Sequence, residues 1–218
     1  MTVEEPITAS EERSFRPLLE GLLVLVPTLY VTAALGVPTL WFAIPLVVIT
    51  IARRPYEDYG LTLHNPGTPL FHAVVSLFVF LPYALGHYLW VYWNLGTPFD
   101  LRLPGDLMNE VFVQTLIVAL PEEFFFRGYM QTQIDKSFGR PYRFLGASVG
   151  LGVPIAAALF ALCHVPFGGV DRMVVFFPGL LYGWLRARTG TVVVPTLYHA
   201  ASNLLMKVMI VSLASRPM

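Results

Sequence analysis

The sequence has few charged residues: they make up 13% of its 218 residues, which is about half of the share usual in soluble domains. Apolar residues make up 56%, and the mean hydropathy is +0.63. This composition excludes an ordinary soluble domain and indicates an integral membrane protein, in contact with membrane lipids. The formal net charge is zero, so no nucleic-acid partner is expected.

Cysteine is nearly absent, since Cys163 is the one cysteine in the chain, and a lone cysteine excludes an intrachain disulfide. The chain also lacks an internal repeat and a low-complexity linker. We therefore expect a single membrane-embedded domain over residues 1–218. The N-terminal leader carries glutamates where a secretory signal would be basic, so we expect the first apolar run to be retained as a span.

Apolar runs bounded by charged and turn residues predict transmembrane segments near residues 18–35, 37–52, 70–93, 107–134, 145–163, 173–185 and 192–213. Helices are expected, because lipid offers no partner to free backbone groups. The second and sixth runs are short for a full crossing. The runs therefore predict an all-α transmembrane bundle of six to eight helices.

The basic residues of the predicted loops are unevenly divided between the two sides of the membrane. Nine fall on the side of the N-terminus: Arg13, Arg16, Arg53, Arg54, Lys136, Arg140, Arg143, Arg186 and Arg188. Three fall on the opposite side: Arg102, Arg172 and Arg216. Cytoplasmic loops carry the excess of Lys and Arg, so we expect a cytoplasmic N-terminus.

Glu122, Glu123 and Arg127 lie inside the fourth apolar run. Ionisable groups within a span cost about 2.5–3.5 kcal/mol each, and they usually face the bundle interior or a wet cavity. Glu123 and Arg127 are four residues apart and share a helix face, so an internal ion pair is one interpretation. Glu122 points about 100° away, and that interpretation leaves it unexplained.

Two further apolar runs carry polar residues at helical spacing. Phe160 and His164 share one face of the fifth run, and His199 and Asn203 share one face of the last. Taken singly, His164 could be an interfacial residue, and the His199–Asn203 pair could hold two helices together. Taken together with Glu122, the residues supply a carboxylate, a second base and a pair of donors, which suits acyl hydrolysis by water.

The chemistry of such a set is simple. A carboxylate in a low-dielectric cavity is a better proton acceptor from water than one in bulk solvent. An imidazole can share the proton or hold the water. An amide N–H and a second imidazole can stabilise the oxyanion of a tetrahedral intermediate.

These motifs resemble those of the type II CAAX prenyl endopeptidase family, part of the group called CPBP or Abi. Residues 122–127 are similar to its EExxxR motif, residues 160–164 to FxxxH and residues 199–203 to HxxxN, in the family's order. Gly128, after the arginine, also fits. The resemblance implies a bundle of about seven to eight helices with an intramembrane catalytic cavity, and a motif-bearing core over about residues 106–205.

The resemblance also implies a function, that of an intramembrane glutamic endopeptidase without cofactor or metal. Glu122 would activate a water molecule with His164, while His199 and Asn203 would form the oxyanion hole. The supporting residues would be Glu123, Arg127 and Phe160. The expected substrate is a membrane-associated, possibly lipidated, protein or peptide, and the expected location is the cell membrane of a prokaryote.

Other interpretations were weighed against this one. Glu122, His164 and His199 could provide the three protein ligands of a catalytic zinc, although the sequence has no H-E-x-x-H motif. A nucleophile–base pair of Cys163 and His164 is disfavoured, because consecutive helical residues diverge by about 100°. A non-catalytic transporter or scaffold that uses the same cavity is the third alternative.

Straight, full-length helices place His164 near the outer face of the membrane and His199 nearer the inner face. Joint catalysis requires the two imidazoles to be close together. We therefore expect a broken or tilted helix, for which Pro154, Pro178 and Pro195 are candidate positions.

Overall fold

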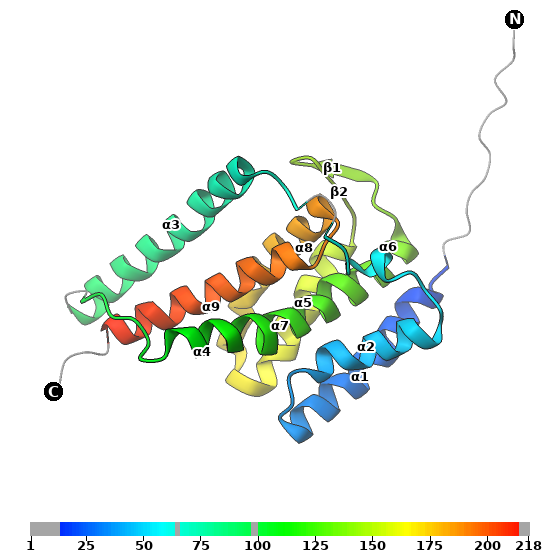
Figure 1. Cartoon of the computed structure of the whole chain (residues 1–218), viewed down its shortest axis with the longest axis horizontal. Helices are drawn as coiled ribbons and strands as arrows, with labels where there is room; N and C mark the ends of the chain where they lie inside the picture. The colour runs from blue at the N-terminus through cyan, green and yellow to red at the C-terminus, as the bar shows by residue number, and fades with distance from the viewer. Residues whose placement is uncertain (1–13, 64–65, 97–99, 214–218) are drawn as a thin grey trace, which may run out of the picture.

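The computed structural model describes residues 14–63, 66–96 and 100–213, and these form a bundle made mostly of helices (Figure 1). Three helices come first: α1 (Arg16–Leu35), α2 (Leu40–Ile51) and α3 (Pro69–Leu95). A long composite helix follows, over residues 107–138. The last three are α7 (Gly152–Gly168), α8 (Phe176–Thr189) and α9 (Val193–Leu213). The acidic leader, Arg13 and Arg216 lie outside the described residues.

The predicted apolar runs and the observed helices agree closely, with one clear error. The fifth run was predicted to be helical from residue 145, but α7 begins only at Gly152. The preceding residues form an antiparallel hairpin of β1 (Tyr142–Phe144) and β2 (Ala147–Val149). Leu145 and Gly146 connect the strands with φ angles of 45° and 79°, and positive φ at both central residues is typical of a tight two-residue hairpin turn.

Within the described residues, two helices are long and apolar enough to cross a membrane, by length and composition: Arg16–Leu35 and Pro69–Trp90. The shorter apolar helices are Leu40–Ile51 and Gly152–Gly168. Large apolar side chains on the outside of α3 are exposed, among them Leu70, Phe78, Leu81 and Trp90. A contiguous apolar surface of this kind is suited to lipid and unsuited to water.

The composite helix alternates between two helical forms. It comprises α4 (Leu107–Phe112), the π-helical η2 (Val113–Ala119), α5 (Leu120–Glu123), the π-helical η3 (Phe124–Met130) and α6 (Gln131–Phe138). Extended π-helical stretches are rare, and π-bulges often occur at functional sites. Glu122 and Glu123 therefore lie in a single α-helical turn between two widened segments.

Three consecutive phenylalanines fix this helix in the bundle. Phe124, Phe125 and Phe126 are all buried. Trp41 of α2 lies 4.7 Å from the ring of Phe125 and 5.2 Å from that of Phe126, and Phe42 lies 4.5 Å from Phe124. Aromatic contacts at these distances stabilise a fold by more than the burial of apolar surface area alone contributes. Helix α2 therefore packs against one side of the composite helix, next to the turn that carries Glu122 and Glu123.

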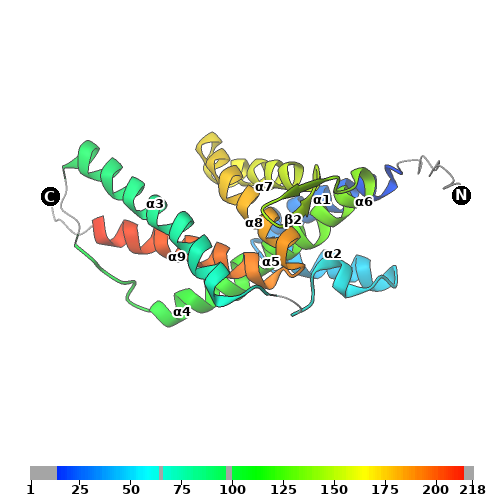
Figure 2. The same cartoon turned by 90° about the horizontal axis from the view of Figure 1, so that it is seen from above.

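Several helices pack along the composite helix. α1 packs against α2 and α6, α7 packs against α8 and α6, and α9 lies along α8, η2 and α5 (Figure 1 and Figure 2). Glu20 ties α1 to this framework: its carboxylate accepts hydrogen bonds from Arg54, Tyr129 and Gln133. The helices that carry the polar motifs therefore meet in one region of the bundle.

Candidate active site

The structure brings Glu122, His164 and His199 together from three separate helices. Oε2 of Glu122, on α5, lies 4.0 Å from Nε2 of His164 on α7 and 3.8 Å from Nε2 of His199 on α9. Both distances are too long for a direct hydrogen bond. Oε2 is buried and has no hydrogen-bond partner among the described residues. This carboxylate oxygen is thus free to act on a molecule between the imidazoles.

Glu123 and Arg127 form the ion pair that their spacing predicts. Nη1 of Arg127 donates to Oε1 of Glu123 at 2.9 Å, and both side chains are 0% exposed. The same carboxylate oxygen accepts a hydrogen bond from Nδ1 of His199 at 2.8 Å. The pair therefore joins η3 to α9, and it orients an imidazole of the candidate site.

Hydrogen bonds also fix which ring nitrogens of the two histidines carry protons. Nδ1 of His164 lies 2.8 Å from the carbonyl oxygen of Phe160, and Nδ1 of His199 lies 2.8 Å from a carboxylate oxygen of Glu123. Both partners can only accept, so each Nδ1 must be the donor. In its neutral form each imidazole consequently presents a bare Nε2 toward Glu122, and only an imidazolium presents an N–H there.

Phe160 lies at the centre of the packing around the site. Its ring is 4.4 Å from that of His164 and 5.8 Å from that of His199, and the guanidinium of Arg127 lies 4.3 Å from its centroid. Tyr182 of α8 stacks on His199 at 5.2 Å with an interplanar angle of 15°. Two aromatic rings thus hold the imidazole and the guanidinium in place, the latter through cation–π contacts.

Asn203 is not in direct contact with this group. It lies one helical turn beyond His199 on α9, and its Nδ2 donates to Oε1 of Gln114 at 3.0 Å. Among the contacts of the described residues, Asn203 forms no hydrogen bond with Glu122, His164 or His199. An amide carries two N–H donors, so one of them is left for a ligand.

Sequence reasoning missed Gln114, which holds Asn203, and Tyr182, which stacks on His199. A signal for Gln114 was present: it is a polar side chain inside the predicted 107–134 run, and such residues usually face the bundle interior. The sequence offers no comparable indication for Tyr182, because a tyrosine in an apolar run can equally well be a residue of the membrane–water interface.

The expected conflict between the depths of His164 and His199 does not arise. The helices α7 and α8 have 17 and 14 residues, which span about 25 and 21 Å, less than the hydrocarbon core of about 30 Å. Helices α7 and α8 are therefore too short to be treated as two successive full crossings of the membrane. The three prolines proposed as break points each occupy the third position of α7, α8 or α9, where proline is tolerated without a kink.

Metal-dependent and cysteine-dependent hydrolysis would each require a different arrangement of side chains. Among the described residues, no group of three or more His, Cys, Asp or Glu side chains is arranged to hold a metal ion. Cys163 is buried, and no hydrogen bond links it to His164. The cysteine pairing that the sequence disfavoured is thus not formed in this structure.

Comparison with known proteins identifies the part of the chain that carries the site. Searches of curated proteins and of solved structures found no match. A family model described as type II CAAX prenyl endopeptidase Rce1-like matches residues 104–205, which include every residue of the candidate site. This match confirms the predicted family and supports a membrane peptidase. The motif-bearing part of the chain, residues 104–205, is thus similar to the Rce1-like type II CAAX prenyl endopeptidases.

Proposed function

We propose that the chain is an intramembrane glutamic endopeptidase that hydrolyses a peptide bond in a membrane-associated or lipidated protein or peptide. The family match supports a CAAX-type protease in general terms. One observation supports the glutamate mechanism: Oε2 of Glu122 has no hydrogen-bond partner and faces two imidazoles at 4.0 and 3.8 Å. A water molecule bound to this oxygen can reach either imidazole.

In the first step, Glu122 removes a proton from that water as its oxygen bonds to the scissile carbonyl carbon. The neutral His164 can accept a hydrogen bond from the water at Nε2, since its Nδ1–H is engaged by the Phe160 carbonyl. General-base assistance of this kind contributes about 10²–10⁴ in rate. The product of this step is a tetrahedral oxyanion with a protonated Glu122.

In the second step, the carbon–nitrogen bond breaks and the proton on Glu122 passes to the leaving amine. His199 and Asn203 are the proposed donors to the oxyanion. Because Nδ1 of His199 donates to Glu123, the imidazole can donate from Nε2 only as an imidazolium. Asn203 would supply the N–H that Gln114 does not use.

Glu123 and Arg127 are proposed to position the site rather than to react. Glu123 accepts from His199 and from Arg127 through one oxygen, so it orients the imidazole. Arg127 balances its charge and also donates to the carbonyl of Gly179 at 3.3 Å. A buried carboxylate without a cation would be costly, so the ion pair with Arg127 offsets part of the cost of burying Glu123.

We propose a prokaryotic cell membrane as the location, with the N-terminus in the cytoplasm. Two of the basic residues assigned to that side, Lys136 and Arg186, meet at Asp58. Lys136 bonds the carboxylate of Asp58, and Arg186 bonds the backbone carbonyl of the same residue. Segments that are distant in sequence thus share one basic end, which supports the orientation.

The test is the isosteric variant Glu122→Gln, assayed in lipid vesicles with a lipidated peptide and its unlipidated counterpart. The variant keeps the shape of the side chain but loses the basic oxygen, so we expect turnover to fall by about 10²–10⁴. Glu110→Gln is a matched control on the same composite helix, where Glu110 pairs with Lys207.

Mass spectrometry of the products would identify the cleaved bond. Cleavage of both peptides would show that the lipid is dispensable. Full activity in a well-folded Glu122→Gln protein would rule out this glutamate as the base, and the absence of turnover in the wild type would favour a non-catalytic scaffold.

A further inference from the structure

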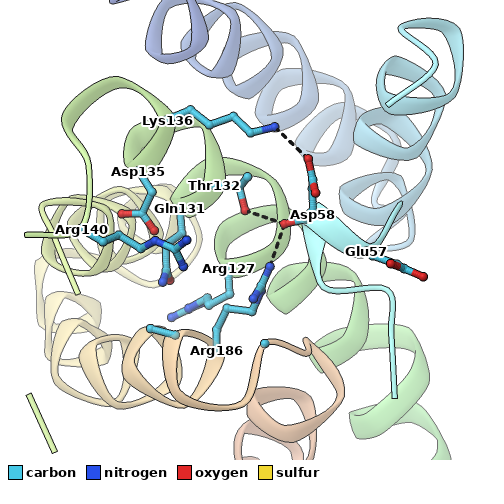
Figure 3. A pocket seen from close by; sticks show the side chains of 11 residues that line it. Glu57, Asp58, Arg127, Gln131, Thr132, Asp135, Lys136, Arg140 and Arg186 are labelled. Carbon is cyan, nitrogen blue, oxygen red and sulfur yellow. Dashed lines mark hydrogen bonds and ion pairs between the residues drawn. The ribbon is translucent and has the colours of Figure 1, made fainter. Parts of the chain in front are cut away.

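A polar cavity that Arg127 helps to line lies outside the Glu122, His164 and His199 group. It has a volume of about 390 Å³ and is enclosed by η1 (Tyr56–Tyr59), the composite helix and α8 (Figure 3). Three arginines line it: Arg127, Arg140 and Arg186. Each comes from a different segment, and Figure 3 shows their side chains around the same space.

The wall of the cavity is a polar seam between the composite helix and α8. Arg127 donates to the carbonyl oxygen of Gly179 at 3.3 Å, and Gln131, one turn later, donates to that of Gly183 at 3.1 Å. A β-carbon on Gly179 would lie 3.2 Å from Nη2 of Arg127, and one on Gly183 would lie 3.1 Å from Oε1 of Gln131. The glycines of α8 therefore allow these polar side chains to lie between the helices.

Several buried atoms of this seam have no partner among the described residues. They are Nε of Arg127, Nε of Arg186, Oε1 of Gln131 and Oδ1 of Asp135. Arg127 is 0% exposed and Arg186 is 9% exposed. Buried polar groups in proteins are nearly always hydrogen-bonded, and an unpaired donor on a charged group is especially costly. Two arginines that line the cavity thus carry buried guanidinium donors that no described residue satisfies.

Two of the three arginines that line the cavity have no ion-pair partner among the described residues. No carboxylate among the described residues forms an ion pair with Arg140 or Arg186. The carboxylate of Asp58 is engaged by Lys136 at 3.4 Å. Burial raises the pKa of Asp135 to about 6, against the opposing attraction of Arg140 and Arg186. The negative charge of Asp135 is therefore weakened in mildly acidic conditions.

We propose that this cavity binds a phosphate-type oxyanion, held by Arg140 and Arg186 with Arg127 at its inner end. Guanidinium groups bind phosphate oxygens through paired, charge-assisted hydrogen bonds. A tetrahedral anion suits three arginines that approach from different segments better than a planar carboxylate does. The basic end of a membrane protein is also the level at which lipid phosphates lie.

Such a ligand would be linked to the peptidase site through one side chain. Arg127 contacts Glu123 through Nη1 at 2.9 Å, while its Nε has no partner and the residue lines the cavity. Glu123 in turn orients His199. The binding proposal itself does not depend on the proposed peptidase function, because it can be tested without turnover.

The test measures thermal stability of the purified full chain in an uncharged, phosphate-free detergent. Inorganic phosphate is added at constant ionic strength, and a short-chain phosphatidic acid is compared with the corresponding diacylglycerol. At ten times the dissociation constant, we expect Tm to rise by about 3–6 °C. A response to both phosphates indicates a site for free or esterified phosphate, and a response to phosphatidic acid alone indicates a lipid headgroup.

Two variants decide whether the response arises in the cavity. Arg140→Ala removes an exposed side chain with no ion-pair partner, so it should leave the fold intact and weaken binding about tenfold or more. Arg143→Ala, an exposed arginine on β1 outside the cavity lining, should bind like the wild type. The proposal is overturned if neither phosphate compound raises Tm, or if Arg140→Ala responds as the wild type does.

Discussion

Oε1 of Glu123 lies 2.8 Å from Nδ1 of His199 and accepts a buried hydrogen bond from it. The contact turns Nε2 of the imidazole toward Glu122, 3.8 Å away. One carboxylate thus fixes the tautomer of a histidine that faces the neighbouring carboxylate. The adjacent glutamates of the sequence consequently have different environments: Glu123 forms a buried ion pair with Arg127, and Glu122 faces two imidazoles.

Removal of Arg127 should destabilise the fold. In Arg127→Ala the buried Glu123 loses its cation, and breaking a buried pair in this way costs about 3–5 kcal/mol. We expect a lower Tm and a lower folded yield, measured by thermal denaturation in detergent, whereas Arg143→Ala serves as an exposed control. The double variant Glu123→Gln/Arg127→Met carries neither charge and should recover part of the lost stability. Normal stability of an inactive Arg127→Ala protein would instead make Arg127 a direct catalytic group.

Asn203 should affect the chemical step more than substrate binding. An oxyanion donor acts on charge that exists only in the transition state, so Asn203→Ala should lower kcat by about 10²–10³ with KM nearly unchanged. Gln114→Ala leaves the amide present but removes its hydrogen-bond partner, and it should cause a smaller loss, about tenfold. Steady-state kinetics with one peptide would distinguish the effects. A large rise in KM at constant kcat would assign Asn203 to substrate binding.

Chelation should leave the peptidase rate unchanged. The proposed mechanism uses Glu122 to activate water, and no zinc-type motif occurs in the sequence. The measurement is activity after exhaustive treatment with a strong chelator, together with the metal content of the active protein. If activity followed stoichiometric zinc and returned when zinc was added, Glu122, His164 and His199 would have to be reassigned as metal ligands.

Stability should depend on the ionisation of Asp135. Burial raises the pKa of Asp135 from 3.8 to about 6, so the native state binds this proton more tightly than the unfolded state. The resulting stabilisation is fully present below about pH 4 and is lost as pH rises through about 6, with an upper limit of about 3 kcal/mol. Asp135→Asn should therefore be more stable than the wild type at pH 7.5, and the difference should shrink toward pH 4.

The measurement is Tm as a function of pH in phosphate-free buffer. Asp171→Asn, at an exposed aspartate of η4 (Val170–Val175), is the matched control. A stabilisation by Asp135→Asn that did not change with pH would show that the effect does not come from the ionisation of this carboxyl.

The helical segments could be predicted from the sequence because apolar runs are a local property. The runs predicted near residues 18–35 and 192–213 correspond to α1 (Arg16–Leu35) and α9 (Val193–Leu213). The hairpin at residues 142–149 was missed, since its tight turn depends on positive φ at Leu145 and Gly146, and Leu145 in an apolar stretch carries no turn signal.

The sequence by itself also determined which side chains required an explanation, because an ionisable group inside an apolar run is costly wherever the helix lies. Only the tertiary structure decided that Glu122 faces His164 and His199, that Glu123 orients His199 and that Asn203 bonds to Gln114. These contacts join helices that are distant in the chain. They depend on the short lengths of α7 and α8 and on the packing around Phe160 and Tyr182, and no local pattern of residues specifies how separate helices pack against one another.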